Sequence, residues 1–427
     1  MKRTISIAYS GVHQAYQLAL AAHQLGRLER FYCSLFAAPG KWGGLAKHLL
    51  GADALRSRAI SGLPRAKICE IPWPLMAHRC RARLQPKSKD DWAMANQWFD
   101  RRVARLLRQS TSALFLGVET CAAESFAVAR EQGMLRILDC PGIDAEFLTG
   151  LALTAADEFD LTTTAEVDSP IIRAMKAREL QLADAIFVGS EFQARLVGKI
   201  IKPWRGVHVL PLWADENFWQ PAERAVMAPA SNSLKILYAG KISLRKGVPY
   251  LLRAVAQCDV NVELTLVGNV AAELLPRLQA PPVNVRVVPA CAKSALRQLY
   301  REHDILVLPS LGDAFGFVAM EAMACGLPVI VTENCGVPVP DPSWRVPVLN
   351  SDAIADRLAL YSEDRERCRA DGQRALVFAR QFTPARYRQQ VGNILAELSA
   401  PLTTAADICH GAGAARIGSP LEHAANE

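Results

Sequence analysis

Short apolar stretches alternate with longer amphipathic ones along most of the chain, and this alternation predicts strands separated by helices. The first series of predicted strands covers 5–10, 113–117, 135–140, 185–190 and a last one within 206–221. The second series covers 234–240, 262–268, 283–290, 305–310 and 328–333. Strands that alternate with helices are typical of parallel sheets covered on both faces. The pattern therefore predicts an α/β protein with two doubly wound, Rossmann-like units.

The two series are separated by residues 222–233, which lack periodicity and are rich in small residues. We interpret this stretch as a linker between an acceptor-side domain, 1–221, and a second domain, 234–379. A helix at about 380–400 is expected to pack back onto the first domain, and residues 401–427 are expected to form a flexible tail. Because ligands bind at the carboxyl ends of strands in such folds, we expect the site in a cleft between the domains.

The composition excludes several classes of protein. Half of the residues are apolar and 21% are charged, which is typical of a soluble globular protein. The apolar runs end well before the roughly 18 residues that a membrane-spanning helix needs. The 11 cysteines form no CxxC pair and the eight histidines no HxxxH spacing. We therefore expect free thiols in a reducing, cytoplasmic compartment, and neither a protein-bound metal nor another cofactor.

The charge is unevenly distributed along the chain. Residues 1–89 carry 15 Lys and Arg against three acids, although the whole chain has a net charge of only +7. Within this part, 41–89 mixes Trp, Leu and Ile with basic residues, so it is a candidate surface for an anionic membrane and a lipid-linked acceptor. The alternative is a solvated surface with insertion loops. No nucleic-acid partner is expected, because no binding module surrounds the charge.

The sequence GDAFGFVAMEAMACGLPVI begins at Gly312, just after a predicted strand. Asp313 lies in the loop, and Gly316 opens a helix that carries Glu321 about one turn further on. A glycine here lets a ligand approach the backbone, and the amides of Gly316, Phe317 and Val318 then form an anion site at the helix start. Glu321 can accept hydrogen bonds from a ribose diol, and Asp313 can bind sugar hydroxyls. The alternative is a helix whose lone acid faces water.

A second loop, in YAGKISLRKGVPYLL (238–252), concentrates positive charge at the end of a predicted strand. Lys241 and Lys246 flank it, and Gly240 and Gly247 permit a close turn. A diphosphate in the cleft needs two cations that converge from such a loop. The alternative is a solvated basic turn. The chain contains neither GxGxxG nor GxxxxGK[ST], so the dinucleotide and P-loop fingerprints do not apply.

Residues 235–336 carry four motifs in order: YAGKISLRKG, LTLVGN, LRQLYREHDILVLPS and DAFGFVAMEAMACGLPVIVTENCG. Together they resemble the donor-binding half of the retaining GT-B-fold glycosyltransferases of family four, also called group 1. The resemblance implies a nucleoside-diphosphate sugar as donor and no divalent cation, because lysines supply the charge. It also implies that Lys241 and Lys246 grip the diphosphate and Glu321 the ribose, while Asp313, Phe315 and Gly316 border the sugar. The family usually has Glu at the position of Asp313.

The amino half resembles the family over 183–197 and 209–221, and less closely elsewhere. Only Gly11 follows the first strand, where the family often has paired glycines, and it is expected to border the donor. Val118, beside Glu119, stands where the family often has a histidine, so no catalytic histidine is assigned. His13 and Glu119 are candidates to face the cleft. For His13 the alternative is a helix cap or a surface residue.

The resemblance implies transfer of a sugar, with retention of configuration, to a hydroxyl of a glycan, glycolipid or polysaccharide precursor. Two rival interpretations stay open. One is a GT-B nucleotide-sugar epimerase, and the other is a catalytically silent subunit that binds nucleotide sugars. No carboxylate is evidently placed as a nucleophile, which favours front-face attack.

Overall fold

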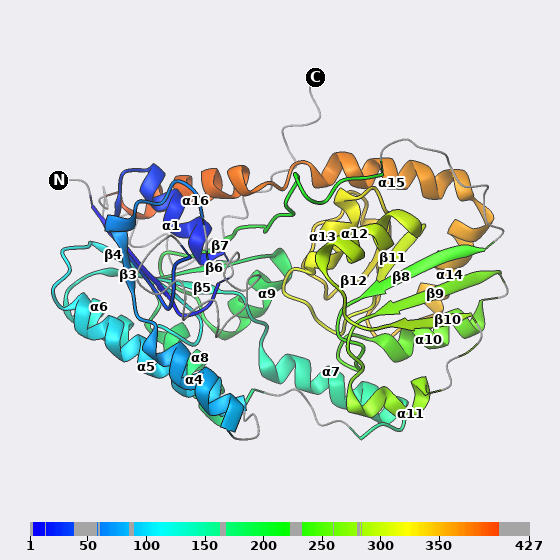
Figure 1. The fold of residues 1–427 in the computed structure, drawn as a ribbon, viewed down its shortest axis with the longest axis horizontal. Helices are drawn as coiled ribbons and strands as arrows, with labels where there is room; N and C mark the ends of the chain where they lie inside the picture. Colours follow the sequence, from blue (N-terminus) through cyan, green and yellow to red (C-terminus); the bar gives the residue numbers. More distant parts are fainter. Residues whose placement is uncertain are drawn as a thin grey trace.

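The computed structural model describes residues 3–12, 14–37, 58, 60–84, 89–162, 168–222, 233–258, 260–279, 282 and 284–400. Within these residues the chain forms two parallel sheets, one of seven and one of six strands, that lie side by side (Figure 1). The two predicted doubly wound units are therefore confirmed. The predicted tail, 401–427, and most of the predicted linker fall outside the described residues.

The first sheet has the strand order β3-β2-β1-β4-β5-β6-β7. Its strands are β1 Ile5–Tyr9, β2 Leu28–Cys33, β3 Ile68–Glu70, β4 Leu114–Val118, β5 Leu135–Cys140, β6 Ala185–Val188 and β7 Val207–Val209. Its helices are α1 Ala15–Gln24, α4 Trp73–Leu84, α5 Lys89–Leu107, α6 Ala123–Glu131, α7 Ala145–Glu158, α8 Pro170–Leu182 and α9 Glu191–Ile200, with a short 3-10 helix η1 Arg65–Lys67. All residues of β1 and β4 are buried, because helices cover both faces of a parallel sheet.

The second sheet has the order β10-β9-β8-β11-β12-β13. Its strands are β8 Leu234–Ala239, β9 Val262–Val267, β10 Val285–Val288, β11 Ile305–Leu308, β12 Val329–Thr332 and β13 Arg345–Val346. The other elements of this domain are α10 Val248–Gln257, η2 Ala272–Leu274, α11 Leu275–Leu278, α12 Lys293–Glu302, α13 Phe317–Ala324, η3 Pro342–Trp344, α14 Ser351–Glu363 and α15 Arg365–Ala379, and the last helix of the chain is α16 Pro384–Leu398.

The last helix returns from the second domain to the first. Figure 1 shows α15 and α16, in orange, running along one side of both domains. Helix α16 packs on α1, and near its start a guanidinium nitrogen of Arg388 donates to the side-chain oxygen of Gln17 at 2.7 Å. The chain thus crosses between the domains twice. Among the described residues, no helix combines the length and apolarity that a membrane crossing requires.

Strand order determines where each domain can bind a ligand. In the second sheet the chain runs from β8 outward to β10 on one side, and from β11 outward to β13 on the other. The first sheet reverses in the same way between β1 and β4. At such a switch point the loops at the carboxyl ends of the two central strands diverge and leave a crevice. The predicted site residues of both domains follow these four strands or begin the helices after them.

Candidate functional site

The loop after β8 is shaped by two glycines in the left-handed region of backbone space. Gly240 has φ 144° and Gly247 has φ 69°. A Cβ added to Gly247 would lie 1.8 Å from the carbonyl oxygen of Pro309, so only glycine fits there. The hydroxyl of Tyr238 donates to the carbonyl oxygen of Lys241 at 2.6 Å and holds the start of the loop. The side chain of Lys241 is exposed at this end of the sheet.

Lys246 lies at the other end of this loop and meets the loop after β11. Its ammonium nitrogen is 2.5 Å from a carboxylate oxygen of Asp313. The two loops are also joined through the backbone, since the amide of Leu311 donates to the carbonyl of Arg245 at 3.0 Å. Asp313 is held in turn by the loop after β12, because its amide donates to the carbonyl of Asn334 at 2.9 Å. Two residues 67 positions apart are thus brought together at the switch point.

Helix α13 begins at Gly316, as predicted, but the reason for the glycine differs from the one expected. Gly316 has φ 79°, and a Cβ added to it would lie 2.6 Å from the sulfur of Cys335. Backbone conformation and tight packing therefore require the glycine, independently of any ligand. Phe315 points into the core with 2% of its surface exposed, and its ring lies 5.3 Å from that of Phe317. Phe317 is exposed and Val318 is half-buried.

Glu321 is half-buried on α13 and is not a carboxylate free in water. The hydroxyl of Tyr300, from α12, donates to its carboxylate at 3.2 Å. Burial raises the pKa of Glu321 to about 7, although nearby Lys293 and the bond from Tyr300 act in the opposite direction. A carboxyl group with this pKa changes charge near neutral pH. It can accept hydrogen bonds from a ligand when it is ionised.

In the first domain the candidates lie at the switch point between β1 and β4. Gly11 follows β1 and is buried, and a Cβ there would lie 2.6 Å from the ring of Tyr9. Glu119 follows β4 and has one carboxylate oxygen 3.5 Å from the ammonium of Lys176, while the thiol of Cys140 donates to the other at 3.3 Å. Lys176 also pairs with Asp168 at 2.8 Å. His13 lies outside the described residues.

Two buried acids near this switch point were not predicted. Asp139 is the last residue but one of β5, accepts from the side-chain amide of Gln14 at 2.8 Å, and has its pKa raised to about 7 by burial. Glu179 accepts from the backbone amides of Thr120 and Ala122 at 2.6 and 2.7 Å. It thereby holds Thr120, whose φ of 71° is unusual for a residue with a branched side chain. The one sequence signal for either acid was the position of Asp139 near the end of the apolar run LRILDC.

The two domains are in direct contact where the segment after β6 meets the loop after β11. The hydroxyl of Ser190, at the start of α9, donates to the carbonyl of Ala314 at 2.7 Å. Gly336 packs closely against this hydrogen bond, because a Cβ added to it would lie 2.0 Å from the carbonyl oxygen of Ala314. The loop that carries Asp313 therefore contacts the first domain. Among the residues that the structure describes, no three His, Cys, Asp or Glu side chains are grouped as metal ligands would be.

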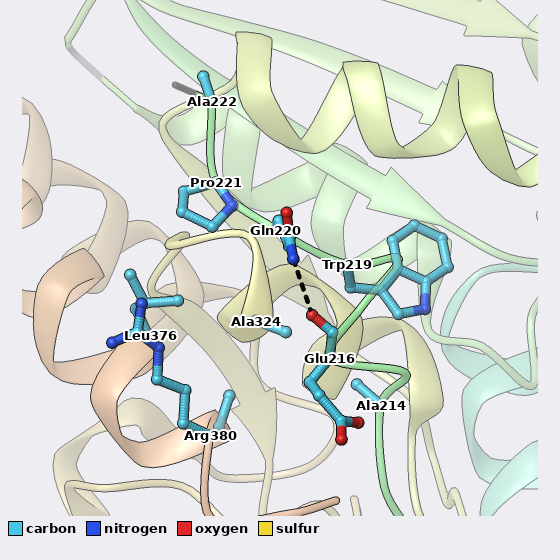
Figure 2. Close-up of a pocket in the computed structure, with 10 residues that line it drawn as sticks. Ala214, Glu216, Trp219, Gln220, Pro221, Ala222, Ala324, Leu376 and Arg380 are labelled. Carbon is cyan, nitrogen blue, oxygen red and sulfur yellow. Dashed lines mark hydrogen bonds between the residues drawn. The ribbon is translucent and has the colours of Figure 1, made fainter. Parts of the chain in front are cut away.

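A separate hollow of about 400 Å³ lies where the chain leaves the first domain. Figure 2 shows Glu216, Gln220 and Pro221 around it, with Arg380 of the α15–α16 connection on the opposite side. The side-chain amide of Gln220 donates to the carbonyl of Glu216 at 3.2 Å. None of the predicted donor residues lines this hollow.

Two solved structures share this fold over nearly the whole chain. Sucrose-phosphate synthase of Thermosynechococcus elongatus superposes with a TM-score of 0.62 and 17% identity, covering 93% of this chain and 99% of that one. HepE of Anabaena, in complex with UDP and glucose, superposes with a TM-score of 0.57 and 16% identity, covering 92% and 100%. At these identities the similarity establishes the fold alone. The two domains form a GT-B fold.

A family model matches most of the second domain. Residues 233–364 match the family model described as glycosyl transferases group 1. D-inositol 3-phosphate glycosyltransferase 1 of Catenulispora acidiphila is 31% identical over 151 residues, which are 31% of this chain and 36% of that protein. The D-inositol 3-phosphate glycosyltransferase of an Arthrobacter species is 29% identical over 159 residues, 34% and 38% of the two chains. The chain thus matches less than half the length of these relatives, and the family model itself covers less than half of this chain.

Proposed function

We propose that this protein transfers a sugar from a nucleoside-diphosphate sugar to an acceptor hydroxyl with retention of configuration. The observation that carries the proposal is the meeting of Lys246 and Asp313 at the switch point of a sheet that matches the group 1 family. Relatives named D-inositol 3-phosphate glycosyltransferases, and a fold shared with HepE bound to UDP and glucose, support the same class of reaction.

The chemical problem is the separation of charge as the bond between the sugar and the diphosphate breaks. The electron pair leaves with the diphosphate, and positive charge develops on the sugar ring. Lys241, Lys246 and the amides at the start of α13 stabilise the leaving group in this proposal. One preorganised donor of this kind contributes roughly 2.7–4 kcal/mol to the transition state. Asp313 orients the sugar, and Glu321 accepts hydrogen bonds from the ribose.

Retention is proposed to proceed by front-face attack. The acidic side chains at the first switch point already have partners: Glu119 is paired with Lys176, and Asp139 accepts from Gln14. Neither is therefore proposed as a nucleophile. In front-face attack the acceptor oxygen forms the new bond to the anomeric carbon, and its proton passes to the departing phosphate oxygen. In this proposal Gly11, after β1, borders the donor, and Glu119, after β4, faces the cleft.

A donor-turnover assay with purified protein tests the proposal. A panel of nucleoside-diphosphate sugars, first ranked by thermal shift, is incubated with and without hydroxyl acceptors, and release of nucleoside diphosphate is measured. Acceptor-dependent release of nucleotide with retained configuration is expected. An altered sugar nucleotide formed from donor alone indicates an epimerase, and binding without any turnover indicates a silent subunit. Either result overturns the proposal.

Contact with an anionic membrane is a second part of the proposal, and residues 41–57, 59 and 85–88 of the candidate surface 41–89 fall outside the described ones. Helix α4 within this segment and helix α5, which begins at its end, support the proposal. Trp73 of α4 is 48% exposed and its ring stacks on that of Trp98 from α5 at 5.6 Å. Arg101 and Arg105 of α5 are exposed as well. Aromatic and basic side chains together suit the headgroup region of an anionic bilayer. Co-sedimentation with vesicles that contain anionic lipid, and not with neutral ones, is expected.

A further inference from the structure

Helix α7 belongs to the first domain in sequence but reaches the second domain in space. It lies between β5 and α8, which both belong to the first domain. Figure 1 shows it crossing beneath the gap between the two sheets, with its end beside α10 and α11. Toward its start, the ring of Phe147 packs on that of Phe192 from α9 at 5.7 Å. The helix therefore has one attachment on each domain.

The attachment to the second domain consists of charged and aromatic contacts at the end of α7. Glu158 accepts a hydrogen bond from the hydroxyl of Tyr250 at 2.5 Å and pairs with Arg253. The ring of Phe159 lies 4.7 Å from that of Tyr250, with the guanidinium of Arg253 4.1 Å from its centre. Arg277 of α11 donates to the carbonyl oxygen of Phe159. Phe159 is buried by these contacts, beside a hollow of about 350 Å³.

This attachment is close in sequence to one half of the candidate site. Tyr250 and Arg253 are on α10, which begins at Gly247 directly after Lys246. The loop after β11, which carries Asp313, meets the start of α7. A Cβ added to Gly312 would lie 2.6 Å from a methyl carbon of Leu148 and 3.6 Å from one of Ile143. Gly312 directly precedes Asp313, so Leu148 packs against the backbone of the loop that carries this carboxylate.

We propose that Leu148 is a positioning residue for Asp313, and that Glu158 and Phe159 anchor α7 so that Leu148 stays against Gly312. This inference rests on the proposed function and assigns α7 a part in it. A glycine at 312 leaves room for the leucine side chain, and the leucine in turn limits the positions that the loop can adopt. A displacement of about 1 Å at a reacting group is enough to lower a rate by roughly 10²-fold. The geometry of the donor sugar therefore depends on a helix supplied by the other domain.

The test exploits the close fit between Gly312 and Leu148. Gly312 does not have a positive φ, so Gly312→Ala adds a methyl group without backbone strain and displaces the leucine. We expect Gly312→Ala and Leu148→Ala each to lower kcat about tenfold. The double variant is expected to recover to within about threefold of the wild type, because the new methyl group fills the space that the leucine vacates. Leu148→Met is expected to stay within about twofold.

Binding and stability measurements separate positioning from a general loss of structure. Nucleoside diphosphate alone lacks the sugar, so its affinity is expected to change less than twofold in every variant. Glu158→Gln is also expected to lower kcat while the affinity for nucleoside diphosphate changes less than twofold. Leu153→Ala, at a 55% exposed position on the same helix, is expected to leave kcat unchanged. The melting temperature of each variant shows whether it folds.

The inference is overturned if the double variant shows no recovery, or if the single variants keep wild-type kcat. It is also overturned if kcat, nucleotide affinity and melting temperature all fall together, because that is the result of a merely structural contact. These outcomes differ from a failure of the proposed function, in which the wild-type protein itself turns over no donor.

Discussion

The ammonium nitrogen of Lys246 lies 2.5 Å from a carboxylate oxygen of Asp313, and the side chains are 17% and 20% exposed. The pair joins the loops after the two central strands of the second sheet. A diphosphate that binds Lys246 must compete with Asp313 for the donor hydrogens of the same ammonium group. The ion pair therefore couples the binding of the phosphates by Lys246 to the orientation of Asp313, the carboxylate proposed to bind the sugar.

Replacing Lys246 removes a cation from the leaving group. Lys246→Ala is expected to lower donor turnover by roughly 10²–10³-fold, which is typical for the loss of one preorganised donor at a developing charge. The rate of nucleotide release under saturating donor is the measurement. Lys199→Ala, at an exposed position on α9, is the matched control and is expected to keep full turnover. Equal rates for the two variants would remove Lys246 from the site.

Replacing Asp313 is expected to change binding and turnover in opposite directions. Asp313→Asn removes a negative charge from beside Lys246, so nucleoside diphosphate alone is expected to bind about threefold or more tightly. Turnover is expected to fall roughly tenfold, because a hydrogen bond to the sugar is lost. Titration calorimetry and steady-state kinetics give the two values. Asp313→Glu keeps the charge and serves as the control. If Asp313→Asn lowered both affinity and turnover, the diphosphate would not compete with Asp313 for Lys246.

The raised pKa of Glu321 predicts a pH dependence of stability. The pKa of the unfolded carboxyl group is 4.5, and burial raises that of the folded group to about 7. Between these values the folded state binds more protons than the unfolded state, so stability falls as the pH rises from about 4.5 to about 7 and is level above it. The difference corresponds to roughly 3 kcal/mol at most. Glu321→Gln is expected to flatten this part of the stability profile, which urea unfolding at several pH values measures.

The raised pKa of Glu321 also predicts that the affinity for nucleotide rises with pH. Ribose hydroxyls donate to the ionised form of Glu321, so binding favours loss of its proton. Affinity for nucleoside diphosphate is therefore expected to increase about tenfold between pH 6 and pH 8. Because the phosphates and Asp139 also titrate, the wild type is compared with Glu321→Gln at each pH. Identical pH profiles for the two proteins would show that the ribose does not contact Glu321.

The glycine that begins α10 is expected to be essential for the loop of Lys246. In Gly247→Ala, a positive φ costs about 1–2 kcal/mol, and the clash with the carbonyl of Pro309 adds to it. A fall of at least about 2 kcal/mol in the free energy of unfolding is expected. Gly198→Ala is the control, because Gly198 lies within α9 and a Cβ there meets nothing within 4 Å. It is expected to stabilise the protein by about 0.5–1 kcal/mol. A tolerated alanine at 247 would contradict the geometry of the loop.

The sequence predicted most of the strands and missed β2, β3 and β13. Strands such as β1 and β11 are buried on both faces and therefore read as unbroken apolar runs. In strand β2 the buried Leu28 is followed by the polar residues Glu29 and Arg30, which are at least partly exposed, so its pattern is weaker. The edge strands β3 and β13 have only three and two residues. Runs this short cannot be distinguished from loops by periodicity.

The site was predictable as a set of residues and not as a set of contacts. Each of Lys246, Asp313 and Glu321 follows from a local motif, but their partners depend on strand order and helix packing. The pairing of Lys246 with Asp313 requires β8 and β11 to be neighbours. Glu179 lies in an ordinary amphipathic helix, and its burial follows from the packing of α8 against the loop after β4. Such tertiary contacts leave no signal in one sequence.

The central claim is that Lys246 binds the diphosphate and Glu321 the ribose of one nucleoside diphosphate. A crystal structure of the protein with the nucleoside diphosphate that gives the largest thermal shift tests this directly. The account predicts a phosphate oxygen within about 3.2 Å of the Lys246 ammonium and ribose hydroxyls hydrogen-bonded to Glu321. A nucleotide bound elsewhere, or at this crevice without contact to either side chain, would contradict it.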